Sequence, residues 1–461
     1  MVRRMSNQKF VKMSIVLLFF LSILVLWENP AGDDIALARS FYLSSDPHDY
    51  LGAFSTIFYG LFPSIYGSWW HGLLLFQLII AFFGLILIYK FFNQISLSST
   101  LAYIAFSYFA LLMAGASSRD GTMISLLLFG IGLLTLSINT SIVRLRQLLK
   151  IFAFSIFILS FSFRPWLSIV IVPILIWTFM ISGKLNTKRN ASLILILAVV
   201  LISAPVFTDQ AAKKIFDLND GYPEQMVMIH DLSTTYCWGS NPKAVDSAYQ
   251  GLTQISANAN ALKNLCQFYR PNTWQAVVFP NINDLSINGL VTPLRIIAVS
   301  EEAKYSAVRN SWLSSIKYDP FGYIQNHLMF ATQVLVSGEM REISFLKPIE
   351  SWKKISYLDT ALFFGRGLFL IPFDLFRSFH IFSPLVALTI FFVRARNIRD
   401  QKEKRTVQIY FVSFLAWVTM TSISYASDNG RYTYGAVLLF YLGIFLSNSS
   451  NLEHFKSDKI K

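Results

Sequence analysis

The sequence predicts an all-α polytopic membrane protein, and three observations support this prediction. Of the 461 residues, 54% are hydrophobic and only 14% are charged, whereas soluble domains carry about 25% charged residues. The apolar residues form long runs of about 20 residues, the length that a helix needs to cross the hydrocarbon core of a bilayer. Lysine and arginine are concentrated in a few short connections between the runs. We therefore expect about ten transmembrane helices, with interfacial helices and one large extracytoplasmic segment.

The apolar runs define the predicted membrane helices in chain order. They lie at 11–27, 70–92, 99–117, 121–138, 149–163, 166–182, 191–207, 378–394, 407–426 and 432–448. The first run follows basic residues, but no convincing small-residue cleavage site comes after it, so we expect a retained anchor rather than a signal peptide. The fifth run is short, and Arg164 and Pro165 separate it from the sixth.

The distribution of basic residues predicts the orientation of these helices, because cytoplasmic connections are enriched in lysine and arginine. Basic residues cluster at the N-terminus, at 143–150, at 183–190, at 394–405 and in the C-terminal tail. If the ten helices alternate, all these segments fall on one side, which is then the cytosol. The net charge of +13 is mostly explained by this topology, so nucleic acid is not an expected partner.

The predicted topology divides the chain into three parts. We expect an N-terminal transmembrane module at 1–207 with its first outer loop at 28–69, an extracytoplasmic segment at 208–357, and a C-terminal part at 358–461. The last part would begin with an interfacial helix and continue with the C-terminal transmembrane helices.

The apolar stretch 357–376 is interpreted as that interfacial helix, lying on the outer membrane face. It is long enough to span, but it contains an arginine, a proline and an aspartate, which are costly against lipid. The alternative is that it does span. That would require a second crossing earlier in the chain, for which the stretch HLMFATQVLV is the best candidate.

The extracytoplasmic segment contains both cysteines of the chain, Cys237 and Cys266. Outside the cytosol two thiols at this spacing are expected to form a disulfide, which stabilises by about 3 to 4 kcal/mol in the chain-entropy model. The alternative is a pair of buried free thiols. The six histidines are scattered, and none stands three or four residues from another, so the sequence shows no metal-ligand spacing.

Each of the short outer connections contains a single arginine, although basic residues are otherwise concentrated on the predicted cytoplasmic side. These arginines are Arg39, Arg119, Arg164 and Arg431, each beside a predicted membrane boundary. A guanidinium group is costly there without a partner, and it matches phosphate oxygens in bidentate geometry. One interpretation is therefore a cluster that binds phosphate or pyrophosphate at the outer leaflet. The alternative is snorkelling or local pairing, for example of Arg119 with Asp120.

Two adjacent carboxylates, Asp33 and Asp34, closely follow the first apolar run in the stretch WENPAGDDIALARSF. The residues after them suit a helix with one apolar face at the membrane interface. One interpretation is that the pair supplies the N-cap and first-turn charge of this helix. The other is a general base, because partial desolvation raises the pKa of a carboxylate and makes it a better proton acceptor.

Four segments follow one another along the chain in a recognisable order: GDDIALARSF, SSRDGTMISLLLFGIGLL, SFRPWLSIVIVPILIW and DNGRYTYGAVLLFYL. Together they resemble the polyprenyl-phosphate-dependent glycosyltransferases of the GT-C superfamily, in particular the membrane core of bacterial protein mannosyltransferases and aminoarabinose transferases. The resemblance covers about the first 210 residues and the last 80 or so. The central segment resembles no known acceptor-binding module.

The resemblance implies a function for the residues in these segments. Asp33 or Asp34, with Asp33 preferred, would deprotonate an acceptor hydroxyl as it attacks the anomeric carbon of a sugar linked to polyprenyl phosphate. The arginines would stabilise the charge that develops on the departing lipid phosphate, and Asp120 would bind the sugar or orient a partner. The substrate-binding residues would be Arg39, Arg119, Asp120, Arg164, Arg431 and Tyr432.

The same resemblance implies a multi-pass protein of the bacterial inner membrane with its active site on the extracytoplasmic face. The expected partners are a polyprenyl-phosphate-linked sugar, membrane lipids, and a glycan, lipid or protein acceptor of the cell envelope. No cofactor is required by the sequence, and a divalent cation is left open. The alternatives are an O-antigen polymerase or ligase, against which the acidic pair argues, and a lipid-linked sugar transporter, for which an internal repeat is expected but not found.

Overall fold

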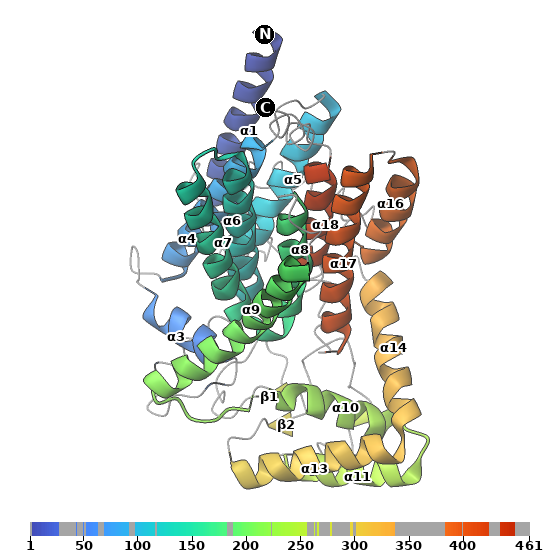
Figure 1. Cartoon of the computed structure of the whole chain (residues 1–461). Helices are drawn as coiled ribbons and strands as arrows, with labels where there is room; N and C mark the ends of the chain where they lie inside the picture. The colour runs from blue at the N-terminus through green and yellow to red at the C-terminus, as the bar shows by residue number, and fades with distance from the viewer. Residues whose placement is uncertain are drawn as a thin grey trace, which may run out of the picture.

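The computed structural model shows a bundle of helices with a smaller layer of helices beneath it (Figure 1). The residues that the structure describes are 2–26, 43, 49, 52–62, 69–91, 97–115, 118–181, 188–222, 224–255, 262, 265–266, 277–278, 296–297, 301–336, 383–398, 400–423 and 434–447. The predicted interfacial helix at 357–376 lies outside these ranges.

Every one of the predicted apolar runs overlaps with helical structure. The first five correspond to α1 (Val2–Leu26), α4 (Trp69–Lys90), α5 (Leu97–Gly115), α6 (Arg119–Asn139) and α7 (Val143–Ser162). The sixth consists of the 3-10 helix η1 (Pro165–Val170) followed by α8 (Ile171–Ile181). The remaining runs correspond to α9 (Lys188–Ile215), α16 (Pro384–Asn397), α17 (Gln401–Ile423) and α18 (Tyr434–Ser447).

Four helices in the described part of the chain are long and apolar enough to cross a membrane. They are Trp69–Lys90, Arg119–Asn139, Val143–Ser162 and Ala191–Ile215. Shorter apolar helices lie at Ser99–Gly115, Pro165–Met180 and Gly435–Ser447. The prediction of a helical membrane protein is thereby confirmed at this level, and the number of ten spans stays a prediction.

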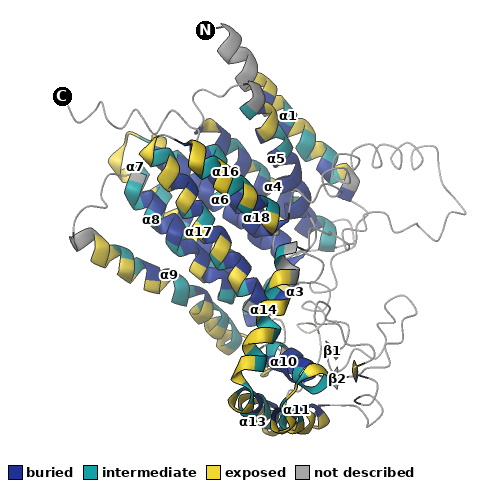
Figure 2. Ribbon diagram, turned by 90° about the vertical axis from the view of Figure 1, so that its right-hand side faces the viewer, coloured by how far each residue is buried: buried dark blue, intermediate teal, exposed yellow. Residues whose placement is uncertain are grey.

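Figure 2 shows exposed residues along α1 and α9, and many of these residues are large and hydrophobic. On α9, Leu195, Ile196 and Val199 are each more than half exposed. Such residues would be unfavourable against water, whereas in a bilayer they meet lipid tails of the same polarity. The exposed apolar surface of α9 is therefore consistent with its assignment as a membrane span.

The helix α6 lies at the centre of the bundle, in contact with α4, α5 and α7, and nearly all of its residues are buried. Glycines let α4 and α6 approach closely. A Cβ added at Gly84 would lie 2.7 Å from the backbone of Leu128 and Phe129, and one added at Gly132 would lie 2.8 Å from the carbonyl oxygen of Gly84. This contact fixes the position of α6, whose first turn carries the motif SSRDG.

The predicted extracytoplasmic segment contains a helical unit with an apolar core of its own. It consists of α10 (Gln225–Trp238), α11 (Pro242–Thr253) and α13 (Glu302–Tyr318), which lie below the bundle in Figure 1. Cys237 and Cys266 form a disulfide, which confirms that prediction.

Two short strands and a further helix lie outside the bundle and the lower unit. Strands β1 (Val277–Val278) and β2 (Ile296–Ile297) pair in parallel. Helix α14 (Pro320–Val336) runs from the lower unit back to the bundle (Figure 1). There it packs against α17, and the Ser383 hydroxyl donates a hydrogen bond of 2.9 Å to the carbonyl oxygen of Leu335. The stretch HLMFATQVLV, the alternative crossing, forms the second half of α14.

Candidate functional site

The last four residues of the motif SSRDG, Ser118 to Gly121, form the start of α6. Ser118 has an extended backbone and caps the helix, because its side-chain oxygen accepts a hydrogen bond of 3.0 Å from the Gly121 amide. Serine is among the preferred N-cap residues, and an aspartate in the first turn is favoured by the helix dipole. Arg119 and Asp120 follow the cap and are 8% and 6% exposed. The local sequence therefore explains why both charged side chains enter the bundle at a helix N-terminus.

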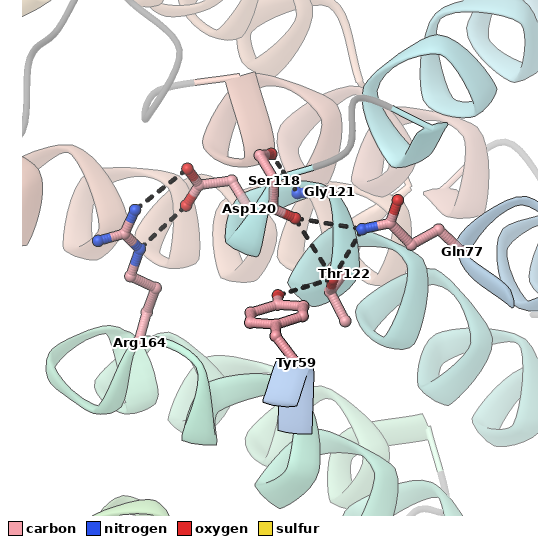
Figure 3. Close-up of polar contacts among 7 residues, drawn as sticks. All are labelled: Tyr59, Gln77, Ser118, Asp120, Gly121, Thr122 and Arg164. Carbon is pink, nitrogen blue, oxygen red and sulfur yellow. Dashed lines mark hydrogen bonds and ion pairs between the residues drawn. The ribbon is translucent and has the colours of Figure 1, made fainter. Parts of the chain in front are cut away.

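Asp120 forms a two-point ion pair with Arg164, which lies between α7 and η1 (Figure 3). The Arg164 Nε donates to Asp120 Oδ1 at 3.1 Å and its Nη2 donates to Oδ2 at 3.2 Å. The break predicted at Arg164 and Pro165 positions this side chain, because α7 ends at Ser162 and η1 begins at the proline. The second basic motif, SFRPWL, is thereby brought against the first.

A network of uncharged polar groups lies beside the ion pair (Figure 3). The hydroxyls of Tyr59 and Thr122 share a hydrogen bond of 2.9 Å. The Gln77 Nε2 donates to Thr122 Oγ1 at 2.7 Å and to the Ser118 carbonyl oxygen at 3.2 Å. The Gln77 Oε1 is buried and has no hydrogen-bond partner in the described part of the protein. The network joins α4 and α6 to α3 (Ala53–Leu61), which lies within the predicted first outer loop.

Both flanks of the predicted acidic segment lie near this cluster. Leu26, the last residue of α1, packs so closely against Gly115 that an added Cβ would collide with its Cδ1 atom. Gly115 precedes the cap residue Ser118 by only three positions. On the other flank, α3 carries Tyr59 to Thr122. Leu26 and α3, which are described on either side of the acidic segment, therefore both lie near the start of α6.

Three of the predicted site residues lie at the start of α6. Arg119 and Asp120 are neighbours in the chain, and the fold brings Arg164 against Asp120. The pairing named as the alternative was Arg119 with Asp120, whereas the ion pair that forms links Asp120 to Arg164, 44 residues later. The other predicted site residues lie outside the described part of the chain: Asp33, Asp34, Arg39, Arg431 and Tyr432.

Sequence reasoning missed Tyr59, Gln77 and Thr122. A signal existed for Gln77, since it is an amide within the otherwise apolar run GLLLFQLIIAFFGLILIY, and a buried amide inside a membrane helix needs a polar partner. No comparable signal marks Tyr59 or Thr122, because tyrosine and threonine are common in membrane helices.

Charged groups and a helix dipole meet at this place. The Asp120 carboxylate pairs with the Arg164 guanidinium, and the N-terminus of α6, where Arg119 lies, adds the positive end of its dipole. Among the described residues, no group of three or more histidine, cysteine, aspartate or glutamate side chains is placed to hold a metal ion.

Comparison of the chain with protein-family models, curated proteins and solved structures found no match. The fold and the site define a helical membrane protein with a buried polar cluster, built around the ion pair of Asp120 and Arg164, at the start of a central helix.

Proposed function

We propose that the protein is an integral-membrane glycosyltransferase that moves a sugar from a polyprenyl-phosphate donor to an extracytoplasmic acceptor of the cell envelope. The observation that carries this proposal is the hydrogen bond between Tyr59 and Thr122, because it docks the first outer loop onto the start of α6. Helix α3, in the predicted loop that also contains Asp33 and Asp34, thus meets the helix that contains Arg119 and Asp120.

In the proposed reaction the arginines bind the phosphate of the donor. When the bond between the anomeric carbon and the phosphate oxygen breaks, negative charge grows on the leaving phosphate, and fixed cations aimed at it lower the barrier. Asp120 holds the planar guanidinium of Arg164 at two points, so its orientation is set before the donor arrives. Asp33 or Asp34 takes the proton of the acceptor hydroxyl as that oxygen forms the new bond to the anomeric carbon.

Unsatisfied buried oxygens support a substrate that is rich in hydroxyl groups. The Gln77 Oε1, the Ser55 Oγ and the Thr56 Oγ1 are buried and make no hydrogen bond in the described part of the protein. Leaving such a group without a partner costs about 1 to 3 kcal/mol. A sugar hydroxyl, which both donates and accepts, could satisfy the oxygen of Gln77 beside the ion pair.

The disulfide supports an extracytoplasmic site in the bacterial inner membrane. Disulfides persist in oxidising compartments and are rare in the cytosol, so the unit with Cys237 and Cys266 is expected outside. That unit lies at the same end of the bundle as α3, which contacts the start of α6 (Figure 1). The ten-span topology predicted from the basic connections gives the same orientation.

The test separates a catalytic carboxylate from a helix cap. Asparagine caps a helix about as well as aspartate, so Asp33→Asn and Asp34→Asn should cost at most about 1 kcal/mol if the pair is a cap. Loss of a general base typically costs 10²- to 10⁴-fold in rate. We expect one of the two variants to lower sugar transfer at least about 100-fold with unchanged donor binding, while Asp46→Asn in the same loop serves as the control.

The assay would use purified protein in detergent with a panel of polyprenyl-phosphate sugars, and would follow release of the lipid phosphate. Wild-type rates in both asparagine variants would show that the acidic pair is only a helix cap and would contradict the proposed general base. A panel that includes pyrophosphate-linked oligosaccharides addresses the alternatives. Turnover of those donors alone would indicate a polymerase or ligase, and transport without lipid-phosphate release would indicate a transporter.

A further inference from the structure

A second polar cluster lies at the base of α3, where the first outer loop meets the C-terminal end of α9. The carboxylate of Asp49 is 5% exposed and accepts a hydrogen bond from the Gly221 amide. Its Oδ2 atom also lies 2.8 Å from the Lys213 Nζ. The Asp49 amide donates a backbone hydrogen bond of 3.2 Å to Asn219. One residue of the first outer loop is thus held at three points by the segment 213–221.

The next contact along the loop is made by Asp209 of α9. Its Oδ1 atom accepts a hydrogen bond of 2.8 Å from the Phe54 amide in the first turn of α3. The N-cap residue of α3 is Gly52, which has no side chain to cap the helix. A carboxylate 155 residues away therefore supplies the cap that the local sequence lacks.

The backbone of Gly52 explains how the chain turns between these contacts. Its φ of +92° lies in a region that side chains rarely adopt, and an added Cβ would approach the Asp209 Oδ1 to 3.3 Å. Two contacts, one before and one after this turn, hold α3 to α9. Asp49 pairs with Lys213, and the Phe54 amide donates to Asp209. We name Asp49, Asp209 and Lys213 the loop clamp.

The loop clamp is linked to the candidate site through α3. This helix has only nine residues, and an isolated helix shorter than about 12 to 15 residues is marginal in water. At one end it is capped by Asp209, and farther along it Tyr59 bonds to Thr122. Between them the Phe54 ring packs edge-on against Phe163, the neighbour of Arg164, at 5.1 Å. Freeing the first contact would therefore loosen the others.

Lys213 has a particular part in this arrangement, because it pairs with Asp220 as well as with Asp49. Asp209, on the same helix, lies close enough for the charges of the Lys213 ammonium group and of the Asp49 carboxylate to act on it. Without that ammonium group, the carboxylates would repel one another, and Asp49 would be buried without its counter-charge. The repulsion would push the first outer loop away from α9.

We infer that Asp49 and Lys213 are positioning residues, which hold α3 of the predicted first outer loop against the start of α6. The effect on sugar transfer rests on the proposed function, whereas the effect on the order of α3 does not. Removing the ammonium group should thus lower the rate of transfer without weakening the binding of donor, because neither residue belongs to the donor-binding cluster.

The experiment compares Lys213→Met with Lys214→Met, a matched control in which the neighbouring, exposed lysine is changed. We expect hydrogen exchange of the amides of residues 53–61 to be at least about tenfold faster in Lys213→Met. The kcat for transfer should fall at least about tenfold while the KM for donor stays within about twofold. Lys213→Arg should restore most of both properties, because it keeps the charge, and Lys214→Met should match the wild type.

A second variant, Asp49→Asn, keeps the experiment informative if Lys213→Met does not fold. In Asp49→Asn the side-chain oxygen still accepts from the Gly221 amide but the charge opposite Lys213 is lost, so a smaller change in the same direction is expected. If the amides of residues 53–61 exchanged at the wild-type rate in both Lys213→Met and Asp49→Asn, the loop clamp would not hold α3. Faster exchange with unchanged kcat would overturn the positioning role. Failure of the wild type to transfer any sugar would count against the proposed function and leave the exchange arm as the test of the clamp.

Discussion

Asp120 and Arg164 lie 44 residues apart in the sequence and face each other through two hydrogen bonds, with less than a tenth of either side chain exposed. A buried ion pair of this kind gains little net stability over an apolar pair, but removing one partner leaves an uncompensated charge inside the protein. Its orientation is also fixed, because a guanidinium group bound at two points cannot rotate freely.

The ion pair should show strong coupling in a double-mutant cycle. We expect Asp120→Ala and Arg164→Ala each to lower the free energy of unfolding by about 3 kcal/mol, since each leaves its partner buried and unpaired. The double variant should lose clearly less than the sum of the two. Thermal unfolding of the purified variants in detergent measures this, with the exposed Asp246→Ala as the control. Additive losses would mean that the two side chains act independently.

The contact between α4 and α6 should not tolerate a methyl group at Gly84. The added Cβ would lie 2.7 Å from backbone atoms of Leu128 and Phe129, so a helix would have to shift. We expect Gly84→Ala to destabilise by about 1 to 3 kcal/mol. Gly130→Ala should cost less, because the added Cβ meets the ring of Phe157, at 2.5 Å, rather than a backbone. Equal unfolding midpoints for wild type and Gly84→Ala would contradict the close approach.

The lower helical unit should lose stability in acid because of His230. This side chain is buried in α10, and desolvation lowers the pKa of its imidazole from 6.5 to about 4. Between these pH values the unfolded chain binds a proton that the folded protein does not. The stability due to neutral His230 is therefore complete above pH 6.5 and is lost as the pH falls toward 4, by about 3 kcal/mol in total.

The measurement is the dependence of unfolding free energy on pH for the wild type and for His230→Leu. The carboxylates titrate in both proteins, so the difference between the two slopes isolates the histidine. We expect the variant to lose up to about 3 kcal/mol less than the wild type between pH 7 and 4. Identical slopes would show that His230 keeps an ordinary pKa in the folded protein.

The orientation of the chain can be measured by labelling single cysteines in a background that lacks the native pair. Cysteines at positions of Ser45, Ser240 and Asn429 should react with an impermeant maleimide in whole cells, because these positions are predicted outside. Those at Asn186 and Gln401 should stay unlabelled until the cells are opened. Labelling at Gln401 from outside would overturn the ten-span topology and favour a spanning helix at 357–376.

Much of the fold follows from local features of the sequence. The helices are found where the apolar runs predict them, because a segment in hydrocarbon must satisfy all its backbone hydrogen bonds internally, and that requirement depends on length and composition alone. The helix break at Arg164 and Pro165 has two causes. Proline has no backbone N–H to donate, and a cation is costly in lipid. The disulfide between Cys237 and Cys266 follows from the expected compartment and from there being only two cysteines.

The partners of the polar side chains were decided by the tertiary structure. Nothing in the sequence around Asp120 distinguishes its neighbour Arg119 from Arg164 as a partner, and nothing around Gly52 indicates that Asp209 caps α3. The physical reason is that apolar residues facing lipid and those facing other helices look alike in a membrane protein, so the pattern along the chain predicts helices but not their neighbours. Only the packing of the helices, of α6 against α7 for the first pair and of α3 against α9 for the second, sets which distant side chains meet.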